Sequence, residues 1–141
     1  MTIFVSNDDH LRNHALVRDL RLGAALSQPG GWQLSPLYDV VPRPGVAHER
    51  RLHLEVGDQG KLATLDNTLS RFAAFTPSRA RALEIIRRVW GDVREWKTSF
   101  EAHGASPLLL AQLAGAFRTL EDIASPKLVG QIRGRGNSGI G

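Results

Sequence analysis

The chain has 141 residues, of which 42% are hydrophobic and 23% are charged. This length and composition are typical of one globular domain with its own core, and they exclude a collagen-like or wholly disordered chain. There is no cysteine, which excludes disulfides and thiolate zinc sites and fits a reducing compartment. The net charge of +4 is compatible with phosphate-bearing or acidic partners, and equally with a genome that favours Arg codons.

The N-terminal segment shows no pattern of a signal peptide or a membrane span. No basic region is followed by an apolar run, and no apolar stretch approaches the ~20 residues needed to cross a bilayer. We therefore expect a cytoplasmic protein without a membrane segment. The apolar residues 2–5 fit either a strand or the last turn of a helix, and if they end a longer element, that element has been cut off.

Residues 6–14, SNDDHLRNH, concentrate acids, amides and histidines, and three interpretations are open. Asn and Asp before an apolar run are common in turns and helix caps. His10 and His14 are spaced i, i+4, so on a helix they would face one metal ion, and Asp8 or Asp9 would add an oxygen ligand. Turn-forming residues fill this run, however, and no Glu lies between the histidines as in zinc proteases. The third interpretation is an active site.

Extended segments follow. Residues 14–22 and 32–42 are separated by turn-forming residues, and they predict a β-hairpin with a long connection. Residues 51–57 are predicted to form a further, half-buried strand, because apolar and polar side chains alternate there. The apolar positions of that strand are Leu52, Leu54 and Val56.

From residue 62 onward the apolar spacing changes to that of helices. A first helix over 65–75 is expected to be capped by Asp66. Its apolar face holds Leu69, Phe72 and Phe75.

A longer helix is predicted next, with Thr76 as its N-cap and Pro77 at its first position. Gly91 lies inside the pattern and is expected to weaken or bend this helix, and Gly104 is expected to end it. The apolar residues recur at spacings of three and four, and they are Leu83, Ile86, Trp90, Val93, Trp96 and Phe100.

Ser106 and Pro107 predict the start of another helix. Its apolar face holds Leu109, Leu110, Leu113, Phe117 and Leu120. The C-terminal end is rich in glycine and poor in apolar residues, so we expect a domain over 1–125 and a disordered tail over 126–141. The predicted class is α+β and mainly α, with a short β-hairpin region followed by a helical bundle.

Two spacings favour the active-site interpretation of the polar cluster. Asp8 and Asn13 are separated as in the D-x-x-x-x-N of kinase catalytic loops, and Asp39 follows an extended, aromatic-ended run, where a second metal-binding carboxylate is needed. In phosphoryl transfer one carboxylate accepts the proton of the attacking hydroxyl. Another carboxylate and an amide hold the magnesium that bridges the nucleotide phosphates.

The segment NDDHLRNHAL followed by GWQLSPLYDVVP closely resembles the C-terminal part of HipA-type serine/threonine kinases, the toxins of bacterial toxin–antitoxin modules. In that family a D-x-H-x-x-N loop is followed by a short hairpin and an L-[ST]-P-x-Y-D segment. The resemblance covers most of residues 3–125 and implies a fold like the C-lobe of a protein kinase.

The resemblance also implies residue roles, with Mg²⁺ and ATP as cofactors. Asp8 corresponds to the catalytic base, and Asn13 and Asp39 correspond to the magnesium ligands. His10 and Arg12 correspond to positions that shape the loop. The neighbouring Asp8 and Asp9 leave the assignment of the base open by one position, and the spacing to the rest of the motif favours Asp8.

Members of that family have an N-terminal lobe with a phosphate-covering loop, a lysine for the phosphates and an adenine hinge, and no glycine-rich loop precedes Asp8 here. Because kinase catalysis is mainly positioning and electrostatics, we expect the chain alone to be inactive. It would be half of a split kinase, or a remnant or fragment of a longer one. The implied partners are an N-terminal kinase lobe or a HipB-like antitoxin, and the implied protein substrate is an aminoacyl-tRNA synthetase.

A non-catalytic role is a further hypothesis. An interaction module would bind an antitoxin or nucleic acid through the arginines of the long helix, which are Arg79, Arg81, Arg87, Arg88 and Arg94. A separated C-lobe is also expected to expose an apolar patch, which favours a homo-oligomer. The residues of that expected patch are Ile3, Phe4 and Val5.

Overall fold

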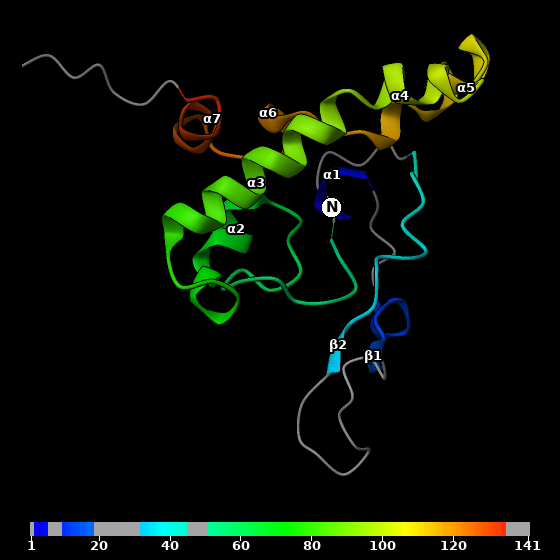
Figure 1. The fold of residues 1–141 in the computed structure, drawn as a ribbon. Helices are drawn as coiled ribbons and strands as arrows, with labels where there is room; N and C mark the ends of the chain where they lie inside the picture. The colour runs from blue at the N-terminus through cyan, green and yellow to red at the C-terminus, as the bar shows by residue number, and fades with distance from the viewer. Residues whose placement is uncertain (1, 6–9, 19–31, 45–50, 135–141) are drawn as a thin grey trace, which may run out of the picture.

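The structure is a computed structural model that describes residues 2–5, 10–18, 32–44 and 51–134. These residues form a helical body from which a two-stranded hairpin projects (Figure 1). The helices are α1 (Thr2–Val5), α2 (Leu65–Ser70), α3 (Arg79–Arg94), α4 (Trp96–Ala102), α5 (Pro107–Leu113), α6 (Leu120–Ile123) and α7 (Pro126–Ile132). The strands are β1 (Leu16–Arg18) and β2 (Trp32–Leu34), and short 3₁₀ turns are η1 (Leu11–Asn13), η3 (Phe72–Ala74) and η4 (Ala114–Ala116). The predicted class, α+β and mainly α, is confirmed.

No helix in the described part of the chain is both long enough and apolar enough to cross a membrane.

The predicted hairpin is present. β1 pairs with β2 in antiparallel register, with Leu16 opposite Leu34, and the ladder continues into a bond from the Ser35 amide to the Ala15 carbonyl (2.8 Å). The connection between the two strands lies outside the described residues. Both strands are short, and most of their side chains are exposed or half-buried.

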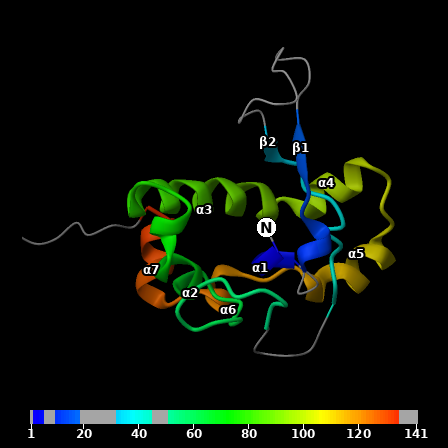
Figure 2. The same ribbon diagram turned by 90° about the horizontal axis from the view of Figure 1, so that it is seen from below.

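The apolar residues of α1 are buried, so the expected exposed patch is wrong. Ile3, Phe4 and Val5 are only 8%, 2% and 2% exposed. The Phe4 ring stacks on Trp90 of α3 at 5.8 Å, and the Phe4 carbonyl accepts a hydrogen bond from the Arg118 amide at 2.9 Å. Figure 2 shows α1 beside the C-terminal half of α3, with the α6 segment on its other side. Helices later in the sequence therefore bury a segment that the sequence alone predicted to be exposed.

Residues 51–57 do not form the predicted strand. The backbone turns back at Gly57 and Gly60, so pairing is limited to isolated bridges such as the one between Arg51 and Leu62. The expected sidedness is nevertheless present, because Leu52 is buried and the next two apolar positions are half-buried, while the residues between them are exposed. The side chains alternate between buried and exposed positions as they do in a strand. The backbone does not form a strand, because no neighbouring segment pairs with it over enough residues.

Asn67 holds this turn against α2 and is only 1% exposed. Its amide nitrogen donates to the carbonyls of Gly60 (3.0 Å) and Leu62 (2.8 Å), and its Oδ1 accepts from the Gln59 amide (2.7 Å). Gly57 packs so closely that a Cβ there would lie 1.8 Å from the Asn67 carbonyl oxygen. One buried amide thus replaces the ladder hydrogen bonds that a strand would have supplied.

The helix caps differ from two of the predictions. Thr64, not Asp66, caps α2 by accepting from the Asn67 amide, and Ser78, not Thr76, caps α3 by accepting from the Arg81 amide. Asp66 instead accepts two hydrogen bonds, both 2.7 Å, from the amide and hydroxyl of Ser125, the N-cap of α7. The wrong caps were each within two residues of the right ones, where several Ser, Thr and Asp compete.

The long predicted helix is divided. Its first part, α3, runs through Gly91 without interruption and ends at Arg94. Its second part, α4, begins at Trp96. The change of direction lets the Trp96 ring stack on Phe117 at 4.0 Å, with Phe100 meeting both rings edge-on. Packing between aromatic rings therefore accompanies a break that the apolar spacing concealed.

The end and restart of the helices near residue 105 are confirmed. Gly104, with a φ of 85°, follows the C-cap of α4, and Ser106 caps α5 with Pro107 at its first position. The predicted helix from there to Leu120 is interrupted, because α5 ends at Leu113 and Leu120 begins α6.

The expected disordered tail from residue 126 is wrong over its described part. α7 occupies Pro126–Ile132, and its apolar residues belong to the core: Leu128, Val129 and Ile132 are 2%, 9% and 5% exposed. The core thus extends past the expected boundary at residue 125, and residues 135–141 lie outside the described residues. Glycine content misled the prediction, since three apolar residues on one helical face were enough to dock the helix on α3.

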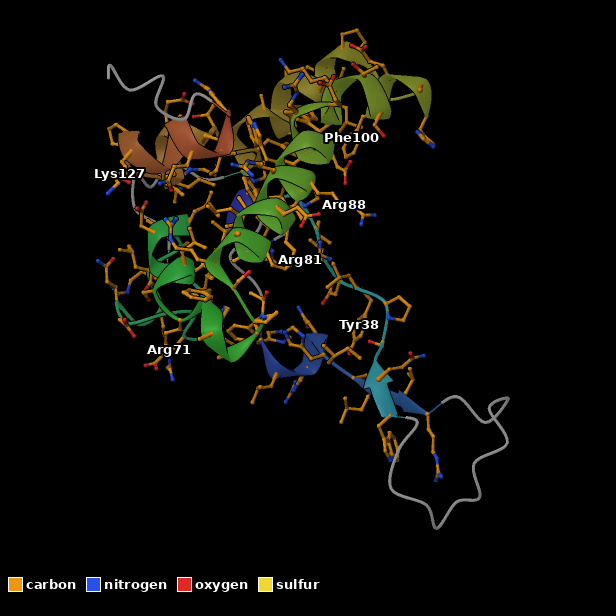
Figure 3. The ribbon with its side chains drawn as sticks, turned by 60° about the vertical axis from the view of Figure 1, so that its left-hand side comes forward. Tyr38, Arg71, Arg81, Arg88, Phe100 and Lys127 are labelled. Atoms are coloured by element: carbon orange, nitrogen blue, oxygen red, sulfur yellow. The ribbon has the colours of Figure 1, made fainter. Side chains whose placement is uncertain are left out.

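Two of the five arginines of α3 hold α7 in place. Arg87 donates to the last carbonyls of α7, Gln131 at 2.7 Å and Ile132 at 3.3 Å, and Arg79 donates to the Gln131 side chain at 3.0 Å. Arg81 and Arg94 form surface ion pairs with acids nearby in the sequence, Glu84 and Glu95. In Figure 3, Arg88 projects from α3 away from α7, and it has no hydrogen bond or ion pair with the described residues.

Candidate functional site

The described part of the polar cluster, residues 10–14, contains a 3₁₀ turn rather than an α-helix. The Asn13 amide donates to the His10 carbonyl at 2.9 Å, and the His14 amide donates to the Leu11 carbonyl at 3.3 Å. His10 and His14, which flank η1, are both in the extended region. The helical geometry that would bring these two histidines to one metal ion is therefore absent. Asp8 and Asp9 lie outside the described residues.

Asn13 ends this turn and points into the protein. It is 8% exposed and, with Asn67, is one of the two buried polar residues of the described chain. A buried side-chain amide is hydrogen-bonded in almost all proteins, and Asn13 has an interaction besides the bond from its backbone amide. Its position in the turn is therefore fixed by the surrounding structure.

Asp39 has an unusual backbone. Its φ is 57°, which makes it the one residue other than glycine with positive φ in the described part of the chain. Asp tolerates this left-handed region better than most residues, and such conformations cluster at functional sites. The side chain is exposed, and it has no hydrogen bond or ion pair with the described residues. No described residue thus competes with a ligand for its carboxylate.

Beyond the end of the β1–β2 ladder, a side-chain hydrogen bond joins the two motif segments. The Tyr38 hydroxyl donates to the Arg12 carbonyl at 2.7 Å, across 26 positions of sequence. Tyr38 directly precedes Asp39, and Arg12 directly precedes Asn13. Figure 3 shows Tyr38 on the segment that leaves β2 and passes beside the η1 turn. The two segments that resemble the kinase motifs therefore lie side by side.

The hairpin and α1 hold the same pair of segments from their ends. The β1–β2 ladder aligns the residues that follow η1 with those that precede Tyr38. Beyond Asp39, the Arg43 amide donates to the Val5 carbonyl at 3.1 Å, which ties the second segment to the buried helix α1. The site segments are thus fixed at the hairpin, at Tyr38 and at α1.

The donor groups in these segments suit magnesium. Asn13 offers an amide oxygen and Asp39 a carboxylate, and hard oxygen ligands of this kind are those that Mg²⁺ prefers. Among the residues described, no three His, Cys, Asp or Glu side chains gather into a metal-binding group.

Two residues near the site were missed by sequence reasoning. Tyr38 stands inside the second motif, and its place before Asp39 was the available signal. His53 lies far along the chain, and its ring is 6.0 Å from that of His10, in an edge-to-face arrangement. Nothing local in the sequence around His53 indicates that contact.

The comparison with known families agrees with the geometry. The model of the family described as HipA-like C-terminal domain matches residues 1–97, which span η1, the hairpin, α2 and α3. No curated protein and no solved structure matches the chain.

Proposed function

The chain belongs to the HipA-like C-terminal domain family, and from that premise we propose that it supplies the proton-accepting and magnesium-holding half of a serine/threonine kinase site. In this proposal Asp8 accepts the proton of the attacking hydroxyl, and Asn13 and Asp39 hold the metal. His10 and Arg12 shape the loop that presents Asp8. Magnesium bound there would bridge the nucleotide phosphates and neutralise the charge that develops on them.

The observation that carries the proposal is the bond between the Tyr38 hydroxyl and the Arg12 carbonyl. Two short motifs can occur together in a sequence by chance. Their chemistry requires that the amide of one and the carboxylate of the other approach a common ion, and this bond brings their neighbours within 2.7 Å. A shared site requires the two segments to be held together, as this hydrogen bond does. Two motifs that occur together by chance would not be expected to be bonded in this way.

The backbone of Asp39 gives further support. A residue that needs only to fill a turn is usually Asn or Gly when φ is positive, and Asp is tolerated. Among the described residues, the carboxylate makes no hydrogen bond that would explain it as a turn-forming group, and its charge is exposed. A metal-binding role explains why an acid stands at this position.

The nucleotide clamp must come from outside the helical body, and the hairpin offers a surface for it. Large apolar side chains are exposed on η1, the strands and the segment after β2: Leu11, Leu16, Val17, Trp32, Leu34, Leu37, Tyr38 and Val41. Apolar surface gathered in this way usually marks a missing partner. We assign that partner as a nucleotide-binding lobe, whether it precedes these residues or belongs to another chain.

The metal half of the proposal is tested with Mn²⁺ as a paramagnetic probe. Sub-stoichiometric Mn²⁺ is expected to broaden the amide signals around Asn13 and Asp39, and excess Mg²⁺ is expected to reverse it. Asp39→Asn should weaken this binding by about tenfold or more, since it removes the charged ligand. Asp92→Asn is the matched control, because Asp92 is an exposed acid of α3 without contacts among the described residues. Broadening centred elsewhere, or unchanged in Asp39→Asn, would contradict the assignment.

The base is tested once a nucleotide-binding lobe is present. Phosphoryl transfer from ATP to a Ser/Thr protein is expected when the chain is combined with the N-terminal lobe of a HipA-type kinase. Asp8→Asn should abolish it, and Asp9→Asn should retain most of it. The reverse order of these two variants would move the base by one position, and transfer retained in both would remove the proposed role.

A further inference from the structure

A shallow depression lies between the η1 turn and the segment that leads into the Asn67-held loop. Its volume is about 360 Å³, and it is lined by His10, Leu11, Arg12, His53 and Leu54. Neither motif comparison nor metal chemistry assigns it a role. Three of its five described lining residues carry side-chain nitrogen donors, and this composition indicates what the depression binds.

The Arg12 side chain gives the depression a permanent positive charge. Guanidinium groups present several N–H donors in a fork that matches carboxylate and phosphate geometry. Arg12 is exposed, and its guanidinium has no hydrogen bond or ion pair with the described residues. None of the described lining residues is Asp or Glu. No described residue therefore competes for the donors of the Arg12 guanidinium, and the chemistry that these donors fit is an oxyanion.

The two histidines complete the donor set. The His10 ring meets His53 edge-on at 6.0 Å, and its Nδ1 atom is buried without a hydrogen-bond partner. Because Nδ1 is enclosed, Nε2 is the ring nitrogen left to meet a ligand, and it donates when it carries the proton. Leu11 and Leu54 supply the apolar part of the lining.

We propose that His10, Arg12 and His53 form an oxyanion site that binds a carboxylate or phosphate group of the polypeptide to be phosphorylated. The anion-binding part stands on the depression alone, and its assignment to the acceptor polypeptide rests on the proposed kinase function. His10 and Arg12 belong to the turn that ends in Asn13, so an acidic group held here lies beside the candidate catalytic loop. The preferred acceptor then carries its Ser or Thr near an acidic or phosphorylated residue.

Anion binding is tested with inorganic phosphate as the probe, in the presence of a chelator and at constant ionic strength set with chloride. The imidazole signals of His10 and His53 are expected to shift together with one saturable dissociation constant. His103 is the internal reference, because its Nδ1 lies 2.7 Å from the Ser99 carbonyl in another part of the fold. Equal, unsaturable shifts of all histidines would overturn the site, and so would shifts caused by Zn²⁺ but not by phosphate.

Two arginine variants separate a built site from general charge. Arg12→Gln is expected to weaken phosphate binding about tenfold, the usual effect of losing a charge-assisted hydrogen bond. Arg88→Gln removes the same charge from an exposed arginine that also has no hydrogen bond or ion pair with the described residues, and it should leave the dissociation constant unchanged. Equal losses in both variants would mean that net charge alone attracts the anion, and the proposal would fail.

The acceptor assignment has its own test. Short Ser peptides with a neighbouring Glu or phosphoserine should compete with phosphate for the His10 and His53 signals, and the matching Gln and Ser peptides should not. If phosphate binds but neither acidic peptide competes, the acceptor assignment is wrong while the anion site stands. Asp39→Asn removes metal binding and leaves phosphate binding intact, so failure of the kinase proposal is distinguishable from failure of this one.

Discussion

Replacing the buried Asn67 by Asp tests how the helical body is held together. The substitution keeps the shape and the Oδ1 acceptor, and it exchanges the amide NH₂ for an oxygen. That nitrogen donates to the carbonyls of Gly60 and Leu62 at 3.0 and 2.8 Å, so the variant places an oxygen against two carbonyls. The side chain is 1% exposed, and water cannot replace the lost donors without opening the loop.

The magnitude follows from these two hydrogen bonds. Each lost bond leaves a buried carbonyl without its partner, which costs about 1 to 3 kcal/mol. The sum is about 2 to 6 kcal/mol, before any cost of burying a carboxylate, compared with about 5 to 15 kcal/mol for the free energy of unfolding of a typical domain. With urea m-values of about 1 to 3 kcal/mol/M, the unfolding midpoint should fall by about 2 M.

Urea unfolding followed by far-UV circular dichroism measures this shift. Asp58→Asn is the control, because Asp58 is an exposed residue of the same loop. This substitution also exchanges Asp and Asn, in the opposite direction. Its midpoint should stay near that of the parent protein. An Asn67→Asp midpoint within about 0.3 M of the parent, a change too small for even one lost buried hydrogen bond, would refute the role given to the amide.

Three further outcomes follow from the same structure. Arg87→Ala should destabilise the protein by about 1 to 2 kcal/mol, because it frees the last carbonyls of α7, whereas Arg88→Ala should change the urea midpoint little. Leu128→Ala should cost about 2 to 5 kcal/mol in a thermal or urea melt if α7 is part of the core, and a cost near zero would return the boundary to residue 125. Asp39→Gly keeps the positive φ at no steric cost, so it should preserve the melting temperature while abolishing Mn²⁺ broadening, and loss of both would mean that Asp39 serves the fold.

Features set by neighbours in the sequence were predictable. Ser106 and Pro107 start α5 because a hydroxyl cap and a fixed φ act within one turn, and Gly104 ends α4 because only the local backbone decides there. The hairpin was likewise predicted, since two extended segments flanked a run of turn formers.

Features set by distant contacts were not predictable. Residues 2–5 carry no periodic signal at that length, and their burial depends on Trp90 and Arg118, which lie more than 80 positions away. α7 was dismissed for its glycines, yet its stability depends on Arg87 and on core residues of other helices. The break at Glu95 was hidden for a similar reason, because the rings it brings together continue the apolar spacing of the helix before it.

The candidate site divides in the same way. Asn13 and Asp39 were found from motif chemistry, which is local, and the structure adds the tie between their segments through Tyr38. His53 was missed because its approach to His10 depends on how the loop before α2 folds back, and that is controlled by Asn67. The proposed metal ligands could thus be predicted from two short segments, and the proposed oxyanion site could be recognised only in three dimensions.

The contacts that hold the site differ in kind from those that hold the body. Buried apolar side chains, stacked rings and the Asn67 amide stabilise the helices, whereas a three-residue ladder, the Tyr38 bond and the Arg43 bond hold the site segments. A two-stranded hairpin is only marginally stable without a covering layer, and this one exposes its apolar residues. A lobe that covered the hairpin would therefore stabilise the same segments that carry Asn13 and Asp39. Nucleotide delivery and metal-site ordering would then be one event, which couples catalytic competence to the presence of the second lobe.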